Sequence, residues 1–299
     1  MKIKPTADIL ASWIKSYVPQ RDLFFLSKED LERKLDLSSV LVMPIDEFFE
    51  HSVYQQLDYV NGYEYWNIKN AQYVIVAESD WIEQLEATDR QFILAAQQKY
   101  ERGLVLPASF IQNIDQIPSD YIQNEHVILQ RGMWEQLDWG CKEQLLTTMV
   151  SEWWDNGECE EAPNELSVFL KHYANRFCVQ QGANCLAAVL YAISEGKQSW
   201  FIDEWVHQKT FIEKLTQYKY RQINAEDLQP GDVAVWNDKS GIIQHAAYYI
   251  GQNIFFNKHG QTIFNPWKLL SKEHLYNEWK HLKFVIYRRE GSLDGINII

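Results

Sequence analysis

Apolar residues in the first half of the chain recur at two different spacings, and each spacing predicts one kind of element. Helical spacing of three to four residues predicts an amphipathic helix over 9–17 and a second helix over 88–103, which begins with a capping box of Thr88 and Gln91. Short apolar runs at 63–68 and 71–78 predict strands. The alternation of helices and strands predicts a small α/β domain.

The second half of the chain has a different order, with helical patterns first and strand patterns last. Helices are predicted over 164–177, 184–195 and 203–220. Apolar strands are predicted at 233–236, 242–251, 254–260 and 283–289. Helices followed by an antiparallel meander are typical of an α+β domain. An acidic break after Gly157 that contains Pro163 separates the halves, so we expect domains at residues 1–158 and 159–299.

Composition argues against several classes of partner. The chain has 299 residues and a net charge of −13, which disfavours a basic face for nucleic acid. No run approaches the roughly 20 apolar residues of a membrane span. Asp8, Ser12 and Lys15 interrupt the first apolar segment, which is therefore not a signal peptide. We expect a cytoplasmic protein whose oligomeric state the sequence does not define.

The four cysteines, at positions 141, 159, 178 and 185, form no CxxC pair, so we expect neither a structural zinc site nor disulfides. The histidines at 126, 172, 207, 274 and 281 have no ligand spacing, and no glycine-rich phosphate loop occurs. We therefore predict no metal and no cofactor. Each cysteine is then either buried filler, which is the default, or a thiol with a chemical role.

Cys185 is the cysteine whose surroundings suit chemistry. It begins a predicted helix that ends at Gly196, and Asn184 stands at the N-cap. A helix N-terminus carries partial positive charge, which lowers the pKa of a thiol, and the Cys185 N–H can serve a developing oxyanion. The alternative is that Cys185 is a small apolar residue packed beside Ala187 and Ala188. A base elsewhere in the chain is needed to decide for chemistry.

His245 is the predicted base. It lies in the middle of the apolar strand 242–251, where a charged imidazole costs desolvation and a neutral one needs partners. A core histidine bonded to a backbone carbonyl is the alternative. Asn257 and His259 share one face of the next strand, and either can fix the tautomer of His245. A cysteine followed by a histidine and a third polar residue on adjacent strands is the logic of a thiol hydrolase.

Four segments of the second half, taken in order, resemble the NlpC-like superfamily of papain-like cysteine peptidases, which cleave cell-wall peptides. HYANRFCVQQGANC resembles its entry segment, with Tyr173 twelve residues before Cys185, and NCLAAVLYAI resembles its nucleophile helix. LQPGDVAVW and QHAAYYIGQNIFFNKHG resemble its first core strand and the strand pair with the catalytic histidine. The resemblance covers roughly residues 165–290. It implies a papain-like domain in which Cys185, His245 and Asn257 form the triad, with His259 as the alternative third member.

The resemblance implies a peptidase or amidase that hydrolyses an amide bond, for example in a cell-wall-derived peptide, through a thioester. Tyr173, Gln181 and Asn184 are then expected near the substrate or the oxyanion. The family has Asp before its nucleophile and Ser-Gly after it, whereas this chain has Asn184, Leu186 and Ala187. Two alternatives stay open: acyl transfer to an amine or lysolipid on the same pair of residues, and a non-catalytic binding protein on this fold.

Overall fold

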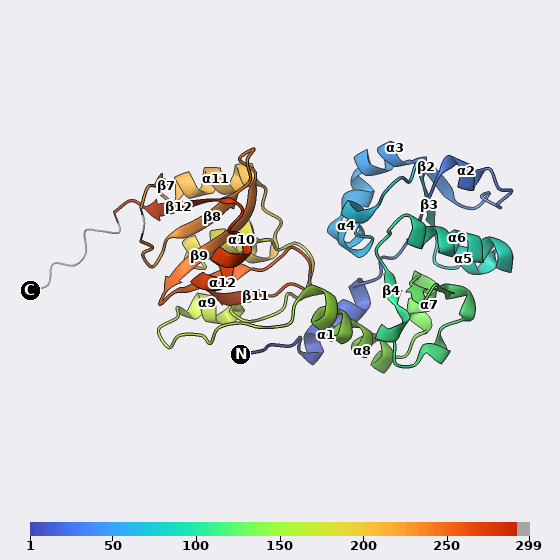
Figure 1. Cartoon of the computed structure of the whole chain (residues 1–299), viewed down its shortest axis with the longest axis horizontal. Helices are drawn as coiled ribbons and strands as arrows, with labels where there is room; N and C mark the ends of the chain where they lie inside the picture. Colours follow the sequence, from blue (N-terminus) through green and yellow to red (C-terminus); the bar gives the residue numbers. More distant parts are fainter. Residues whose placement is uncertain (226, 292–299) are drawn as a thin grey trace, which may run out of the picture. The chain divides into compact units, whose positions relative to one another are not determined.

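The structure is a computed structural model that describes residues 1–225 and 227–291 (Figure 1). The chain forms two compact units. The N-terminal unit is Leu10–Met149, and the C-terminal unit joins Met1–Ile9 to the chain from Val150 onward. The predicted boundary after residue 158 is therefore wrong. The first residues belong to the second unit because the Ile3 N–H donates to the Gly157 carbonyl (2.9 Å).

The N-terminal unit holds two three-stranded antiparallel sheets, ordered β1-β3-β2 and β4-β6-β5. Its strands are β1 (Asp22–Leu26), β2 (Leu41–Pro44), β3 (Tyr73–Ala77), β4 (Val105–Pro107), β5 (Ile122–Gln123) and β6 (His126–Ile128). Its helices are α1 (Ala7–Ser16, which starts in the other unit), α2 (Lys28–Leu31), α3 (Ile45–Glu50), α4 (Leu57–Gly62), α5 (Trp81–Gln84), α6 (Ala87–Lys99), α7 (Arg131–Gln136) and α8 (Trp139–Met149).

The predicted α/β arrangement of this unit is wrong, because its strand pairs are antiparallel. A parallel pair needs a long crossover, usually with a full helix. The helices α2, α3 and α4 are only four to six residues long, so they act as turns between antiparallel strands. The unit is better described as α+β.

Local sequence signals in the N-terminal unit predicted only some of its caps and strands. Ser27 is the N-cap of α2, a residue type that favours this position, and its hydroxyl accepts the Asp30 N–H at 3.2 Å. The capping box at Thr88 is wrong, since α6 begins at Ala87 after Glu86, whose side chain makes no cap hydrogen bond. The segment 63–68 is not a strand but contains a short 3₁₀ helix, because its aromatic residues pack around the end of α4.

The C-terminal unit is built on a six-stranded antiparallel sheet with strand order β11-β10-β9-β8-β12-β7. The strands are β7 (Tyr220–Ile223), β8 (Val233–Asn237), β9 (Ile243–Gly251), β10 (Ile254–Lys258), β11 (Trp267–Ser271) and β12 (Lys283–Arg289). The helices are α9 (Val168–Tyr173), α10 (Cys185–Ile193), α11 (Gln208–Gln217) and α12 (Lys272–Glu278). Helices joined to an antiparallel sheet confirm the α+β class.

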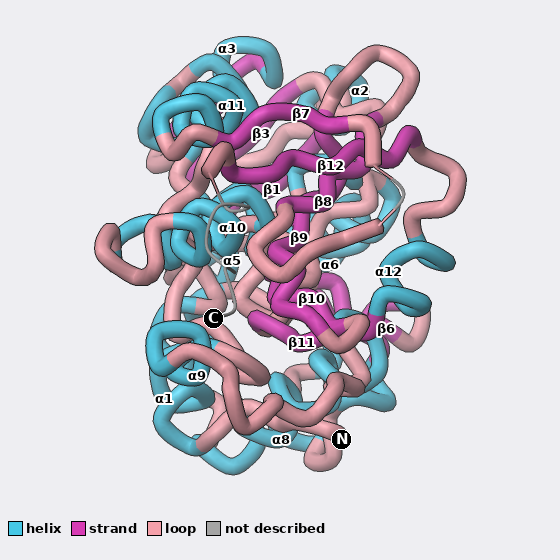
Figure 2. Tube along the Cα trace, turned by 90° about the vertical axis from the view of Figure 1, so that its left-hand side faces the viewer, coloured by secondary structure: helices cyan, strands magenta, loops and turns pink. Residues whose placement is uncertain are grey.

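The two faces of this sheet carry separate apolar clusters. On one face, Val235, Ala246 and Phe256 pack with α10, whose own residues are buried almost throughout. On the other face, Trp236 and Ala247 pack with residues in and after α12. Figure 2 shows α10 and α12 on opposite sides of the strands. Alternation along β8 and along residues 246–250 of β9 produces this division, and the register of the two strands shifts between Trp236 and Asn237.

Strands β9 and β10 are paired over only part of their length. Their register runs from Gly251 opposite Ile254 to Tyr248 opposite Phe256. His245 and Asn257 therefore lie beyond the paired segment, where β10 continues alongside β11 alone. Backbone groups of β9 that face this opening are available to side chains from α10. Among residues 1–225 and 227–291, the helices are too short or too polar to span a bilayer.

Candidate active site

The start of α10 is fixed by Asn184. Its side-chain oxygen accepts the Ala187 N–H at 2.9 Å, and its amide nitrogen donates to the Val206 carbonyl at 2.8 Å. The predicted N-cap is confirmed. Both ends of this buried amide hold the helix in place, so Asn184 positions α10, and the contact with substrate that the resemblance implied stays a prediction.

The loop before α10 depends on a glycine. Gly182 has φ +135°, in the region that side-chain-bearing residues avoid, and a Cβ there would collide with the Asp203 carbonyl oxygen. This close approach turns the chain so that Asn184 can cap the helix. The half-buried Gln181 precedes the turn.

The sulfur of Cys185 lies among backbone N–H groups. Those of Cys185 itself, Leu186 and Ala246 are close enough to lower its pKa, and the positive charge of Lys258 acts in the same direction. Burial nevertheless dominates and raises the pKa of the Cys185 thiol, while these groups oppose the rise. The expectation that the helix N-terminus brings this pKa below its ordinary value is wrong for the resting site. The thiol is protonated at neutral pH.

His245 is enclosed by aromatic rings. Its side chain stacks on Trp279 with ring centroids 5.0 Å apart and planes at 12°, and Trp236 lies at 5.7 Å. Only 2% of the residue is exposed. Burial, with a smaller contribution from the nearby His259, lowers the pKa of His245 from 6.5 to about 3. The imidazole is therefore neutral at neutral pH and able to accept a proton.

Asn257 is the polar neighbour of His245. Its side-chain nitrogen donates to the Lys268 carbonyl at 3.3 Å, and its amide is close enough to His245 to favour the protonated ring. Within the described residues, neither Asn257 Oδ1 nor His245 Nε2 has a well-formed hydrogen bond. Asn257 Oδ1 is an acceptor, and His245 Nε2 can donate when it carries a proton. A small closure would therefore satisfy both atoms, as often happens when substrate binds.

The cysteine and the histidine approach β9 from opposite faces. The Cys185 side chain packs with the α10 cluster, whereas the His245 ring packs with Trp279 beside α12. The backbone of β9 connects the two side chains, because the Ala246 N–H close to the sulfur belongs to the residue after His245. The structure thus places Cys185 at the start of α10 and His245 and Asn257 on neighbouring strands, with the Ala246 N–H close to the sulfur.

The remaining predicted residues have varied surroundings. Tyr173 ends α9 and packs edge-on against Tyr191 and Trp267, at 5.0 and 5.1 Å, so its ring is part of the apolar core around α10. His259 lies after β10, with its ring 6.3 Å from that of His245. Its Nε2 faces Glu278 at 3.4 Å. Both residues act on the pKa of His245, His259 through its charge and Asn257 through its amide, so the choice of third member stays a prediction.

Sequence reasoning missed Trp279 and Lys258. Trp279 follows α12 and no pattern in the chain relates it to His245. Lys258 is 1% exposed, and its ammonium donates to the Thr262 and Asn265 carbonyls at 2.7 and 2.6 Å. Lysine side chains are normally exposed to solvent. The position of Lys258 on the predicted strand 254–260, next to Asn257, was the one signal that this lysine is buried.

Comparisons with known proteins leave the chain without an assigned family. No protein-family model matches it, and neither a curated protein nor a solved structure is similar to it.

Proposed function

We propose that the C-terminal unit is a thiol hydrolase that cleaves amide bonds, with Cys185 as nucleophile, His245 as base and Asn257 as the residue that orients the base. The observation that carries this proposal is the position of the sulfur. It begins α10 and faces the Ala246 N–H, one peptide from a neutral, buried imidazole beside an amide side chain.

The chemistry follows from the two neutral groups. His245 takes the proton of the Cys185 thiol as the sulfur attacks the substrate carbonyl. The backbone N–H groups around the sulfur are donors for the charge that develops, first on sulfur and then on the carbonyl oxygen. The imidazolium then gives its proton to the leaving amine, and water hydrolyses the thioester.

Asn257 and Trp279 support the base in different ways. When His245 becomes charged, its Nε2–H needs an acceptor, and the unpaired Asn257 Oδ1 is that acceptor. The indole of Trp279 covers one face of the imidazole and keeps water from it. Exclusion of water strengthens the His245–Asn257 interaction in the charged state. The reaction requires the His245 ring and the sulfur to meet in the opening between β9 and β10.

This arrangement is the one expected of a papain-like domain, and the order of helix, strand and strand supports that interpretation. A hydrolase and an acyltransferase share every step up to the thioester. They are separated by the product, since an acyltransferase forms a new amide or ester when an amine or alcohol is added.

One observation favours a non-catalytic protein instead: burial raises the pKa of the Cys185 thiol and lowers that of His245. A site used only for binding has no need of a reactive thiol. Reactivity of Cys185 therefore decides between the two possibilities.

The test is labelling of the intact protein with an electrophilic thiol probe, followed by mass mapping of the labelled residue. We expect Cys185 to be labelled first and the Cys185→Ala variant to lose both the label and hydrolysis of peptide amides. The matched control is Cys141→Ala, which removes a buried cysteine of the N-terminal unit. Equal labelling of wild type and Cys185→Ala would point to another thiol and end the proposal.

A further inference from the structure

Three side chains that ligate metals converge beside α12. His274 and Glu278 are one turn apart on this helix, and His259 comes from the loop between β10 and β11. One ligand atom from each lies within 4.8 Å of the others. The spacing of His274 and Glu278, four residues apart, places both on one helix face. The prediction that His274 shows no ligand spacing is therefore wrong.

Two of the distances within this cluster are close to those between ligands of one metal ion. His259 Nε2 lies 3.4 Å from one Glu278 oxygen, and His274 Nε2 lies 3.7 Å from the other. Charge-assisted hydrogen bonds are shorter, at about 2.7–2.9 Å. Ligands about 2.0–2.2 Å from a tetrahedral zinc ion are about 3.3–3.6 Å apart. The cluster is thus too open for good ion pairs and close to the size of a metal site.

We propose that His259, His274 and Glu278 bind one divalent transition-metal ion with the ligand preferences of zinc. Two imidazoles and a carboxylate are a ligand set that zinc uses when a further position stays open. Binding of the ion does not depend on the proposed function of Cys185, because the cluster is defined by the positions of its own three ligands.

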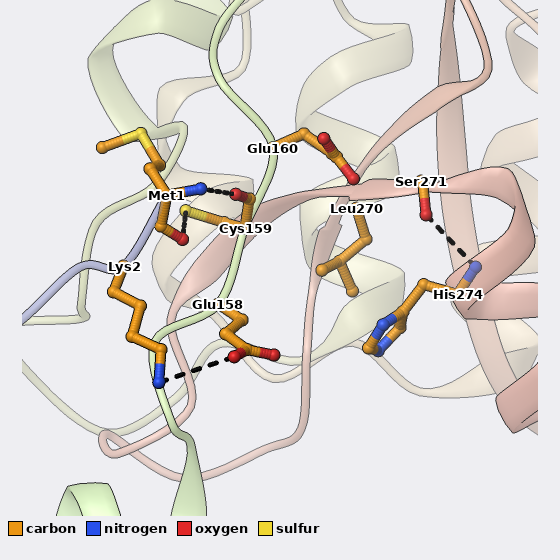
Figure 3. Close-up of a pocket in the computed structure, with 8 residues that line it drawn as sticks. All are labelled: Met1, Lys2, Glu158, Cys159, Glu160, Leu270, Ser271 and His274. Carbon is orange, nitrogen blue, oxygen red and sulfur yellow. Dashed lines mark hydrogen bonds and ion pairs between the residues drawn. The ribbon is translucent and has the colours of Figure 1, made fainter.

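A pocket lies beside the ligands and could receive a molecule bound at the open coordination position of the ion. A pocket of about 410 Å³ adjoins the cluster, and His274 forms part of its wall. Figure 3 shows the His274 ring beside Leu270 at this pocket, with the carboxylate of Glu158 on the opposite part of the wall. An ion held by the three ligands would be reached from solvent by way of His274 and Glu278, whose side chains are 47% and 35% exposed.

Buried polar groups near His259 are available for hydrogen bonds to the metal ligands. A metal-bound histidine usually donates its other ring N–H to an acceptor, often a carboxylate. His259 Nδ1 and Asp155 Oδ2 are both buried and without a hydrogen bond among residues 1–225 and 227–291. Asp155 is near enough to influence the charge of His259, and its other oxygen binds Lys268 at 2.9 Å. Asp155 thus supplies an acceptor and offsets the Lys268 charge.

Occupancy of this site has a structural consequence for the thiol site. Glu278 is the last residue of α12 and precedes Trp279, which stacks on His245. An ion that joins Glu278 to His259 fixes the end of this helix to the β10–β11 loop. It thereby holds Trp279 in place over the imidazole.

The experiment is a titration of the chelator-treated full-length protein, without a polyhistidine tag, with Co²⁺. Visible absorption of the ion reports its coordination, and competition with Zn²⁺ gives the affinity for zinc. We expect one ion per chain with the intense bands of a four-coordinate site. Zn²⁺ should also raise the unfolding temperature of the wild-type protein.

Variants show whether the three residues are the ligands. His274→Ala and Glu278→Gln should each weaken Co²⁺ binding at least tenfold and remove the thermal shift by Zn²⁺. His281→Ala is the matched control, because this exposed histidine lies just after α12 and outside the cluster. Unchanged affinity in the two ligand variants, or no wild-type binding in excess Co²⁺, overturns the proposal. Thiol labelling of Cys185 without metal tests the proposed function separately.

Discussion

The two units of the molecule use buried polar side chains in different ways. In the N-terminal unit, buried side chains bind the backbone. Gln97 accepts the Phe25 N–H at 2.8 Å and donates to its carbonyl at 3.3 Å. Arg102 donates to the carbonyls of Leu23 and Leu129 at 3.1 and 2.8 Å. These side chains connect elements that the short strands of this unit leave unpaired.

In the C-terminal unit, buried polar atoms gather without partners around one end of β9 and β10. His245 Nε2, Asn257 Oδ1 and His259 Nδ1 have no hydrogen bonds among the described residues. A buried polar group without a partner is costly, and native proteins rarely retain several together. Unsatisfied buried atoms also occur at Asp22 and Tyr121 in the N-terminal unit, so the C-terminal unit differs in that three such atoms gather beside the proposed base.

The largest expected effect of a single substitution is on the C-terminal unit. His245→Ala removes the general base, so we expect hydrolysis of a peptide amide to fall about 10²–10⁴-fold. The measurement is kcat/KM for a peptide amide that the unlabelled wild-type protein hydrolyses. His207→Ala, which removes an exposed histidine at the start of α11, is the control and should retain activity. Equal losses in both variants would mean that His245 has no special role.

Arg102→Met probes the structural use of buried polarity in the N-terminal unit. It leaves the carbonyls of Leu23 and Leu129 without their donor, and each unpaired group costs about 1–3 kcal/mol. We expect the free energy of unfolding to fall by about 2–6 kcal/mol, measured by denaturant titration. The rate of Cys185 labelling in the folded protein should stay the same. A slower rate would show that the two units are not functionally separate.

The two units should also respond to pH in opposite directions. Burial raises the pKa of Asp22 from 3.8 to about 7, so its folded form holds a proton that the unfolded chain loses, and stability falls as pH rises from about 4 to 7. The lowered pKa of His245 acts in reverse, so stability falls as pH drops from 6.5 toward 3.

Hydrogen exchange read separately for peptides of each unit, with chelator present, measures both effects. Each group contributes a slope that approaches about 1.4 kcal/mol per pH unit within its range. Asp22→Asn should reduce the slope in the N-terminal unit, and His245→Gln should reduce the one in the C-terminal unit, where the lowered pKa of His259 contributes a slope of the same sign. Slopes of the same sign in both units would contradict the comparison.

The smallest expected effect concerns the cap of α10. Asn184→Ala removes the acceptor of the Ala187 N–H, so the free energy of unfolding should fall by about 1 kcal/mol. Asn184→Asp keeps an acceptor oxygen and should cost less. Thermal unfolding of the three proteins makes the comparison. Activity that falls far more than stability in Asn184→Asp would give this residue a role in binding that its contacts do not indicate.

Local patterns predicted those parts of the fold that depend on neighbouring residues. The cap at Ser27, the helix that starts at Cys185 and the strands around His245 follow from residue type and spacing. The division of the chain and the antiparallel pairing of the N-terminal unit did not, because both depend on contacts between distant segments. The Ile3–Gly157 hydrogen bond is an example.

Local patterns pointed to Cys185 and His245, and the family resemblance to Asn257, and the roles of all three stay predictions. The sign of the Cys185 pKa shift was not predictable, because it depends on how completely the fold encloses the sulfur. Trp279 comes from a helix that no motif connects with β9. Two members of the metal cluster, His274 and Glu278, could be predicted to lie together, because they share a helix face. His259 joins them only through the fold.

The most direct test of the central claim is the rate at which iodoacetamide alkylates Cys185 at neutral pH in the wild-type protein and in His245→Gln. Burial alone makes this thiol slow to react, so a neighbouring imidazole that accepts its proton must show as acceleration. We predict that the wild-type protein reacts at least tenfold faster than the variant. Equal rates would contradict the account, because His245 would then lie near Cys185 without acting on it.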